Sequence, residues 1–511
     1  MYSNKEHINI LTTLLVAHGI RHAVVCPGSR NAPITHNLNE CPDITCYPVT
    51  DERSAGFYAL GMSQALKQPV VVCVTSGTAL LNLAPAVAEA YYQHIPLVVV
   101  SADRPQQWID QLEGQTLPQP DALGRFVKKA VSLPEPHDEE ERWYCNRLIN
   151  EALIIGNAPV HINVPITEPL FEFSVPELPA ERKIERIPAD ISAATLSYVT
   201  RMFLQAKRPT LVSGQPMNPL LDEAVYLVGD DPDYVPDFVL YIGGSIVSKR
   251  VKRFLRKAKE TWVVNETGEV TDTFMNLTHV VQGDGEAVAD HIRFTLVMEP
   301  HPFVQQWDAL LEKIRQQTLA YEPGYSQMAA VKYFEAHVGE AVIHYANSSV
   351  IRLANSFAQH PVWCNRGVNG IEGSLSTAAG FSVVSAARVF CVIGDLSFFY
   401  DQNALWNQNL RRNFRILLLN NGCGGIFNML SGLEGSPARD GIVAAGHHTS
   451  AEGICRQNDI VYLRADGPHD LHQAIDTLLY TESDRPVLLE VFTTADEDEQ
   501  VLKDYYKTLK L

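Results

Sequence analysis

Short runs of apolar residues recur along this chain, and each run leads through a polar turn into a segment of helical length. Two examples are PVVVCVTSGTALLNLAPAVAEAYYQ, which begins at Pro69, and IPLVVVSADRP, which begins at Ile95. Strands of about four to eight apolar residues that alternate with helices are typical of parallel sheets covered by helices. The pattern therefore predicts an α/β fold made of doubly wound parallel sheets.

The same pattern divides the chain into three α/β units, which we expect over residues 1–180, 181–325 and 326–511. Segments rich in Pro and charge separate the units. They are Thr167–Ala189 and about Glu299–Tyr325, of which the second contains one helix. A chain of 511 residues is also long enough for several domains.

The second unit is unusually short. Its strands are predicted in RPTLVSGQ, DFVLYIGG, ETWVVNE and LTHVVQGD. Between Gly214 and Asp237 there are too few residues for the helix, strand and helix that a doubly wound domain normally places there. The unit is therefore either a reduced domain or one from which a disordered segment is missing in the numbered chain.

The third unit begins near Ser326 with the helical pattern MAAVKYFEAHV and the strand AVIHYA. The stretch NSSVIRLANSF is predicted as a turn, and later strands are predicted at Val389–Ile393, Ile416–Leu419 and Pro486–Phe492. The acidic stretch ADEDEQ near the end is most simply a solvated end of the chain.

Bulk composition excludes several kinds of function. The formal net charge of −18 argues against a surface for nucleic acid or for an anionic membrane. No apolar run approaches the roughly 20 residues that span a bilayer, and the start MYSNKEHIN has no apolar signal core. The nine cysteines include no CxxC pair and suit reduced thiols better than a disulfide framework. We expect a soluble, cytoplasmic protein with no nucleic-acid partner and no membrane.

Two predicted strands of the third unit end in polar residues that could hold a metal ion. Gly394-Asp395 follows one strand, and Asn420-Asn421 follows the next. If the strands are adjacent and parallel, Asp395 and Asn421 meet at the carboxyl edge of the sheet, where such sheets bind ligands. A carboxylate, an amide oxygen and a nearby backbone carbonyl suit Mg²⁺, although a strand-end Asp or Asn taken singly is more often only a polar cap.

Glu52 stands where the strand ITCYPVT gives way to a helix. Its flanks are apolar on one side and Ser-Ala-Gly on the other, so partial burial is expected, and burial raises the pKa of a carboxyl group toward neutrality. An acid in the first turn of a helix also stabilises the helix dipole, and this stretch alone favours both interpretations equally. Thr75-Ser76-Gly77-Thr78, at another strand-to-helix junction, is by itself only a good N-cap turn.

Basic residues recur at predicted strand ends and helix starts. They are Arg30 after Pro27-Gly28-Ser29, Arg104 after Asp103, Lys249 and Arg250 after Gly243-Gly244-Ser245, Arg352 after Asn347-Ser348-Ser349, and Arg366 in Cys364-Asn365-Arg366-Gly367. A single surface Arg is usually just solvated. In a strongly acidic protein, however, a cluster of this kind would be needed to hold polycarboxylates, which Arg binds with a bidentate fork.

Ten motifs together carry a family resemblance. In chain order they are CPGSRNAP, TDERSAG, TSGTA, ADRP, GGSIVSKR, NSSVIR, CNRGVNGIEG, STAAG, GDLS and NNGCGGIF. They resemble the motifs of thiamine diphosphate (ThDP)-dependent enzymes, and in particular of the branch that acts in menaquinone biosynthesis. Leu396 stands where many ThDP enzymes carry a second Gly, and GDLS in place of GDG is a feature of this branch. The resemblance covers most of the chain outside the short middle region.

The resemblance implies a pyrimidine-binding first domain, a middle domain and a diphosphate-binding third domain. It implies that Glu52 is the catalytic acid that activates ThDP, and that Mg²⁺ (or Mn²⁺) is held by Asp395, Asn421 and the carbonyl of Cys423. Ile371 would be the apolar prop that keeps the cofactor bent. The residues implied to contact the cofactor are Glu52, Ser76, Gly77, Thr78, Ser348, Ile371, Gly394, Asp395, Leu396, Ser397, Asn421 and Ile426.

The implied substrates are 2-oxoglutarate and isochorismate, both dianions. The residues implied to bind them are Ser29, Arg30, Arg104, Gln115, Lys249, Arg250, Arg352, Arg366, Phe427 and Leu430, of which Gln115 lies in a loop whose alignment could slip by one residue. The implied reaction is decarboxylation of 2-oxoglutarate, followed by 1,4-addition of the resulting succinyl carbanion to isochorismate. As in the family, the active site would lie between subunits of a homodimer or of a dimer of dimers.

Two other functions are compatible with the fold. Another ThDP decarboxylase or carboligase, similar to acetohydroxyacid synthase, would act on small 2-keto acids and typically bind a flavin in its middle domain. The short middle unit and the strand-end arginines point away from that alternative. A non-catalytic ThDP-fold scaffold would be expected to lack Glu52, Asp395 or Asn421, and all three are present.

Overall fold

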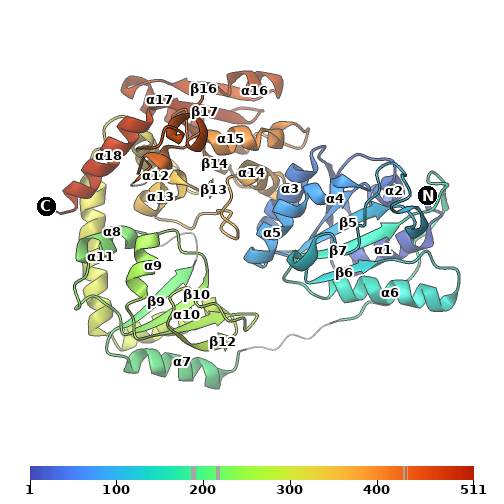
Figure 1. The fold of residues 1–511 in the computed structure, drawn as a ribbon, viewed down its shortest axis with the longest axis horizontal. Coiled ribbons are helices and arrows are strands. Elements are labelled where there is room, and N and C mark those ends of the chain that lie inside the picture. Colours follow the sequence, from blue (N-terminus) through green and yellow to red (C-terminus); the bar gives the residue numbers. More distant parts are fainter. Residues whose placement is uncertain (186–190, 215–218, 430–431, 434, 511) are drawn as a thin grey trace.

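Three parallel β-sheets, each with helices packed against it, form the molecule and lie at the corners of a triangle (Figure 1). The structure is a computed structural model that describes residues 1–185, 191–214, 219–429, 432–433 and 435–510. The predicted α/β class with parallel sheets is confirmed. Among the described helices, none combines the length and apolar character that crossing a membrane requires.

The first unit is built on a six-stranded parallel sheet. Its strands are β2 (His22–Val25), β3 (Thr45–Pro48), β4 (Val70–Val74), β5 (Leu97–Asp103), β6 (Lys129–Ser132) and β7 (Val160–Pro165), in the order β3-β2-β4-β5-β7-β6. Its helices are α1 (Glu6–Ala17), α2 (Ala32–Glu40), α3 (Glu52–Leu66), α4 (Thr78–Asn82), α5 (Ala84–Gln93) and α6 (Glu139–Leu153).

Strand β4 shows why this sheet carries helices on both faces. All five of its side chains are fully buried. Successive side chains point to opposite faces, so Val70, Val72 and Val74 join the core with α3 and α5, while Val71 and Cys73 join the core with α1 and α6. A strand that is apolar at every position is stable only between two such layers.

The second unit has a four-stranded parallel sheet. Its strands are β9 (Pro209–Gly214), β10 (Phe238–Gly244), β11 (Glu260–Asn265) and β12 (Leu277–Gln282), in the order β12-β11-β10-β9. Its helices are α7 (Ala193–Gln205), α8 (Leu221–Val228), α9 (Lys249–Leu255) and α10 (Gly285–Met298). Only α8 is described between the neighbouring strands β9 and β10, so this crossover is as short as the sequence predicted.

The third unit has a five-stranded parallel sheet in the order β13-β14-β15-β17-β16. Its strands are β13 (Val342–Tyr345), β14 (Val389–Gly394), β15 (Phe414–Asn420), β16 (Val461–Ala465) and β17 (Val487–Phe492). Its helices are α12 (Gln327–His337), α13 (Ser349–Phe357), α14 (Ser374–Val384), α15 (Asp395–Tyr400), α16 (Glu452–Gln457), α17 (Pro468–Tyr480) and α18 (Ala495–Thr508). Helix α11 (Pro302–Ala320) links the second unit to the third (Figure 1).

Helix α3 of the first unit crosses α14 of the third unit at very short range. A Cβ atom placed on Gly61 would lie 2.0 Å from the carbonyl oxygen of Thr377, and one on Gly380 would lie 2.2 Å from that of Tyr58. The Tyr58 hydroxyl also donates to the carbonyl of Ala404 at 2.7 Å. The cores of the first and third sheets are therefore continuous through this crossing.

Three segments differ from the sequence prediction. NSSVIRLANSF, predicted as a turn, contains α13, whose buried residues Val350, Ile351, Leu353, Ala354 and Phe357 recur at helical spacing. The first linker contains β8 (Phe173–Val175), which pairs with β1 (Tyr2–Ser3) at the start of the chain. The acidic stretch ADEDEQ is not a solvated end but opens α18, with Asp498 half-buried, because that helix packs back on the third sheet.

Candidate active site

Asp395 and Asn421 leave the third sheet at the same edge, as predicted. Strands β14 and β15 are adjacent and parallel, and Gly394 pairs with Leu419, so the residues that follow both strands meet at the carboxyl edge. The Asp395 carboxylate lies against the backbone N–H groups of Gly422 and Cys423, which belong to the turn after β15. We name this region, from Gly394 to Ser397 and from Asn420 to Gly425, the diphosphate edge.

Asp395 is 4% exposed, and the protein satisfies its carboxyl group only in part. Its Oδ1 accepts the N–H of Leu396 at 2.7 Å, whereas its buried Oδ2 has no hydrogen-bond partner among the described residues. Burial raises the pKa of Asp395, and nearby N–H groups together with His447, whose Nε2 lies 3.4 Å from Oδ2, oppose that rise. A buried carboxylate oxygen that makes no hydrogen bond is a position that a cation can occupy.

Two further oxygen donors accompany Asp395. The amide nitrogen of Asn421 donates to Asp498 at 3.0 Å, which leaves its Oδ1 available to another partner. The carbonyl of Cys423 accepts one hydrogen bond, from Gly425 N at 3.0 Å, and keeps its second lone pair. This set of hard oxygen donors fits a Mg²⁺ ion that completes its octahedron with phosphate and water. Within the described residues, no cluster of three or more His, Cys, Asp or Glu offers a metal site of another kind.

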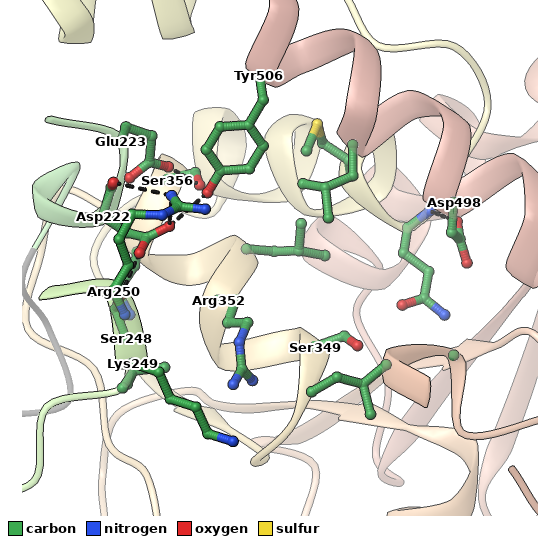
Figure 2. A pocket seen from close by; sticks show the side chains of 18 of the residues that line it. Asp222, Glu223, Ser248, Lys249, Arg250, Ser349, Arg352, Ser356, Asp498 and Tyr506 are labelled. Carbon is green, nitrogen blue, oxygen red and sulfur yellow. Dashed lines mark hydrogen bonds and ion pairs between the residues drawn. The ribbon is translucent and has the colours of Figure 1, made fainter. Parts of the chain in front are cut away.

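A cavity of about 500 Å³ runs from the diphosphate edge to the second unit (Figure 2). Six of the residues predicted from the sequence line it, namely Lys249, Arg250, Arg352, Asn421, Ile426 and Phe427. Lys249 and Arg250 stand at the start of α9, and Arg352 projects from α13. The fold therefore brings cationic side chains from two units together with part of the predicted metal site.

The cations in this cavity suit an anionic ligand. Solvent reaches Arg352 through the open cavity, yet the surrounding walls desolvate its guanidinium group and lower its pKa, and the charge of Arg366 lowers it further. Arg366 is half-buried, and its Nε is a buried donor without a partner among the described residues. Two desolvated guanidinium groups that repel each other would be stabilised by a carboxylate placed between them.

Arg250 is held at the other end of the cavity. Its Nη1 donates to Asp222 Oδ2 at 2.8 Å, and its guanidinium group lies over the rings of Tyr226 and Tyr506. Tyr506 donates to the same Asp222 oxygen at 2.8 Å, and Ser248 donates to the other (Figure 2). Asp222 therefore neutralises Arg250 in this state, and the other cations that line the cavity are Lys249, Arg253 and Arg352.

Glu223, next to Asp222, is buried behind the cavity wall. It accepts hydrogen bonds from Ser356 Oγ at 2.6 Å and from Tyr505 OH at 3.3 Å. Burial raises the pKa of Glu223 to about 7. The sequence did not identify this residue, because nothing in LDEAVYLV distinguishes a buried acid from a solvated one.

A buried amide organises the loop that carries Arg366 and Ile371. Asn347, after β13, donates to the carbonyls of Asn365 at 2.6 Å and Gly370 at 2.8 Å, and its Oδ1 accepts from Arg366 Nη1 at 3.0 Å. From the first unit, Glu89 of α5 accepts the N–H groups of Gly367 at 2.7 Å and Val368 at 2.6 Å. Neither Asn347 nor Glu89 was among the residues predicted for the site.

Residues predicted to contact the cofactor also cluster near the diphosphate edge. The Ser397 hydroxyl donates to the carbonyl of Ile371, whose side chain is 41% exposed. Ser348 is the N-cap residue of α13 and has φ of 76°, and its carbonyl accepts from Arg352 at 2.5 Å. Gly394 and Leu396 flank Asp395 in the chain and are half-buried. The fold thus gathers residues that are up to about 75 positions apart.

Glu52 and the Thr75–Thr78 turn lie at the carboxyl edge of the first sheet instead. Glu52 is half-buried, as predicted, at the first position of α3, and its Oε2 accepts from Asn82 at 3.4 Å. No hydrogen bond or ion pair joins it to the diphosphate edge within the described part of the chain. The N-cap residue of α4 is Gly77, with φ of 86°, so no side chain caps this helix. The N–H of Gly77 donates to Oε1 of the buried Gln119 at 2.7 Å.

The remaining predicted substrate residues are also separate from the cavity. Arg30 is buried and paired with Glu168 at 3.2 Å, and Arg104 lies 3.6 Å from Glu113. Ser29 and Gln115 are exposed on the same edge of the first sheet as Glu52. Leu430 lies outside the described residues.

Comparison with known proteins agrees with this geometry. The family model "Thiamine pyrophosphate enzyme, N-terminal TPP binding domain" matches residues 7–123, and the C-terminal TPP binding domain of the same enzymes matches residues 347–491. These ranges contain Glu52 and the diphosphate edge, respectively. Thiamine pyrophosphate is another name for ThDP.

Similar curated proteins carry one name, 2-succinyl-5-enolpyruvyl-6-hydroxy-3-cyclohexene-1-carboxylate synthase. The protein from Bacteroides thetaiotaomicron is 45% identical and that from Bacteroides fragilis 43% identical, each over 100% of both chains. That from Porphyromonas gingivalis is 34% identical over 99% of this chain and 97% of its own. The first alignment spans 559 positions against the 511 residues here, so that relative has segments without a counterpart in this chain.

Proposed function

The chain belongs to the family of 2-succinyl-5-enolpyruvyl-6-hydroxy-3-cyclohexene-1-carboxylate (SEPHCHC) synthases, ThDP-dependent enzymes, and we propose from this premise how its residues carry out the reaction. The reaction belongs to menaquinone biosynthesis. 2-Oxoglutarate loses its C1 carboxylate as CO₂, and the carbon that held it forms a bond to the ring alkene of isochorismate by 1,4-addition.

One observation carries the assignment of substrate-binding residues. The cavity joins Asn421 of the diphosphate edge to Lys249 and Arg352, so a ligand anchored near the metal site would meet cationic side chains. Small, singly charged 2-keto acids such as pyruvate would leave part of this cluster without a partner. Dianionic substrates would neutralise it, and charge-assisted bonds of this kind are roughly twice as strong as neutral ones.

We assign the cofactor site to the carboxyl edges of the first and third sheets. Bound ThDP supplies the electron sink that allows a 2-keto acid to lose CO₂. Asp395, Asn421 and the Cys423 carbonyl hold Mg²⁺ or Mn²⁺, which neutralises the diphosphate, and Ser348 and Ser397 stand beside it. The remaining cofactor contacts are Gly394, Leu396, Ile371 and Ile426 from the third unit and Glu52, Ser76, Gly77 and Thr78 from the first.

In this proposal, the role of Glu52 is to control the protonation of the cofactor. Its carboxyl group holds a proton at a ring nitrogen of the cofactor's aminopyrimidine. A carboxyl group is suited to this role when it is removed from bulk water, and Glu52 begins α3 in a half-buried position.

The substrates are held by the basic residues. Lys249, Arg352 and Arg366 neutralise and orient the carboxylates from the cavity side, and Arg250 joins them when it exchanges Asp222 for a substrate. Ser29, Arg30, Arg104 and Gln115 contribute from the edge of the first sheet, and Phe427 and Leu430 supply an apolar wall. Holding both substrates in one orientation converts a reaction between two dianions into a step within one complex.

We also propose a dimeric site. Residues 1–180, 181–325 and 326–511 serve as the pyrimidine-binding, middle and diphosphate-binding domains, and Glu52 of one chain faces the diphosphate edge of a second chain in a homodimer or a dimer of dimers. This arrangement would supply the contact that a single chain lacks between Glu52 and Asp395. The nine cysteines are all unpaired, which suits the reducing cytoplasm, where we place the enzyme.

The reaction can be tested with purified protein, ThDP and Mg²⁺. Isochorismate should disappear when 2-oxoglutarate is the donor and persist when pyruvate is the donor. Glu52→Gln should abolish this activity without lowering the melting temperature, and near-normal turnover would remove Glu52 from its role. Loss of isochorismate that is equally fast with pyruvate would instead favour an acetohydroxyacid-synthase-like activity.

The dimeric site has its own test. Glu52→Gln and Asp395→Asn should each be inactive alone, and mixing them under conditions that exchange subunits should restore part of the activity. Restoration requires that a mixed dimer contain one site with both native residues. A mixture that exchanges subunits and stays inactive would contradict a site shared between chains.

A further inference from the structure

Near the start of helix α18, the side chain of Asp498 contacts the diphosphate edge. Asp498 accepts three hydrogen bonds: its Oδ2 from Asn421 Nδ2 at 3.0 Å and from Thr493 Oγ1 at 2.9 Å, and its Oδ1 from the N–H of Gln327 at 2.8 Å. It also lines the cavity that holds Arg352 (Figure 2). Its neighbours Asp496 and Glu497 are exposed, so this one position of the acidic stretch is distinguished by its contacts.

The contact with Asn421 fixes which end of that amide faces the metal site. An Asn side chain can present either its oxygen or its nitrogen to a given side. An ionised carboxylate only accepts hydrogen bonds, so the NH₂ group must face Asp498. The reverse orientation would place the amide oxygen against the carboxylate and lose the bond. Oδ1 is therefore the atom left to face away from Asp498.

Asp498 is itself held in place by two other elements. Gln327 is the first residue of α12, whose unpaired N–H groups and dipole favour a negative charge at this end. The Thr493 hydroxyl follows β17. All three hydrogen bonds are accepted by the carboxylate oxygens of Asp498, and bonds of this kind favour the ionised form.

We propose that Asp498 is a positioning residue for the divalent cation: it orients Asn421 so that Oδ1 faces the ion, and it adds a negative charge behind that ligand. The inference rests on the metal site assigned under the proposed function, and it names a residue that does not touch the ion. Partners that orient a metal ligand typically change metal affinity about 10–100-fold when they are replaced.

The test measures Mn²⁺ binding directly, from the electron paramagnetic resonance signal of free Mn²⁺ in the presence of ThDP. Asp498→Asn removes the charge and lets the Asn421 amide turn over, so the dissociation constant should rise about 10–100-fold. Asp496→Asn removes an exposed charge from the same turn and should stay within about twofold of the parent. Equal affinities for Asp498→Asn and Asp496→Asn would overturn the proposal.

A paired exchange separates positioning from a general structural role. Asn421→Asp combined with Asp498→Asn keeps the total charge and restores the hydrogen bond with donor and acceptor exchanged. This double variant should recover Mn²⁺ affinity to within a few-fold of the parent, even if Asp498→Asn alone is too unstable to purify. Positioning through the hydrogen bond would be overturned if the folded double variant bound Mn²⁺ no better than Asp498→Asn. If Asp498→Asn cannot be purified, the comparison is with the parent, and a double variant that binds Mn²⁺ more than about tenfold more weakly would overturn it.

Asp395→Asn distinguishes failure of this inference from failure of the metal site. If Asp395→Asn loses Mn²⁺ binding while Asp498→Asn keeps it, only the role of Asp498 is wrong. If Asp395→Asn binds Mn²⁺ as tightly as the parent, the metal site is elsewhere and both proposals are wrong.

Discussion

Replacing Gly61 by Ala should force apart the two helices that join the first and third units. The added Cβ atom would lie 2.0 Å from the carbonyl oxygen of Thr377, 2.8 Å from its carbonyl carbon and 3.0 Å from the nitrogen of Phe381. All three atoms belong to the backbone of α14, so no side-chain rotation can relieve the overlap. Ordinary contact begins at 3.4 Å, and the helices would have to separate by about 1.4 Å at this point.

The expected loss of stability follows from that displacement. Overpacking of a tight core costs typically about 1–3 kcal/mol, and a rigid backbone obstacle belongs in the upper part of this range. Alanine is intrinsically better than glycine in a helix by up to about 1 kcal/mol, which offsets part of the loss. We therefore expect Gly61→Ala to lower the free energy of unfolding by about 2 kcal/mol.

Thermal unfolding at one scan rate can measure this effect. A loss of 1 kcal/mol lowers the midpoint by roughly 2–4 °C in a domain of 150–250 residues, so a fall of about 4–8 °C is expected. Gly453→Ala is the matched control, because Gly453 also lies in a helix, α16, and an added Cβ there meets nothing within 4 Å. Equal midpoints for Gly61→Ala and Gly453→Ala would refute the close crossing of α3 and α14.

Three further predictions concern Arg352, Glu89 and Glu223. Arg352→Ala should raise the KM for the substrates far more than the Kd for ThDP, and a selective loss of ThDP affinity would contradict its role as a substrate clamp. Glu89→Gln should raise the KM for the substrates by loosening the loop that carries Arg366, because a Gln amide can accept only one of the two loop N–H groups well. Removing such a hydrogen bond costs about 1–3 kcal/mol. Unchanged kinetics would show that Glu89 does not position the loop. Burial raises the pKa of Glu223 to about 7 from 4.5, so the stability it contributes is full below about pH 4.5 and is lost as pH rises toward 7. The midpoint of thermal unfolding of Glu223→Gln, measured relative to that of the parent, should therefore rise between about pH 5 and pH 8. A difference between the two midpoints that does not change with pH would exclude this titration.

The meeting of Asp395 and Asn421 at one edge of the sheet was predictable from the sequence because the signal is local. Apolar strands followed by Gly394-Asp395 and Asn420-Asn421 need only to be adjacent and parallel for the polar residues to meet, and β14 and β15 are adjacent. The half-burial of Glu52 was likewise predictable from its place between an apolar strand and small residues. Such predictions use only the ends of neighbouring elements.

Asp498 and Glu89 could not be predicted in the same way. Asp498 stands in ADEDEQ, whose composition is that of a solvated face, and only the packing of α18 brings it to Asn421, 77 positions earlier in the chain. Glu89 sits on an amphipathic helix and meets a loop of another unit 278 positions later. Long-range contacts of this kind depend on how units dock, and sequence periodicity carries no information about docking.

A position at a strand end was not enough to predict which arginines share a site. Arg30 and Arg352 occupy similar positions in the sequence pattern, yet Arg30 is buried against Glu168 whereas Arg352 opens into the cavity. Arg250 reaches the cavity with its charge already matched by Asp222. The partner of each cation is set by tertiary structure, and so is its availability to a substrate.

The coupling of CO₂ release to carbon–carbon bond formation tests the central claim most directly. The purified protein would be incubated with ThDP, Mg²⁺, isochorismate and 2-oxoglutarate labelled at C1, and labelled CO₂ and remaining isochorismate would be counted in the same sample. We predict one CO₂ released for each isochorismate consumed, and loss of both signals when either substrate is omitted. CO₂ release that continues at the same rate without isochorismate would contradict a synthase and identify a simple decarboxylase.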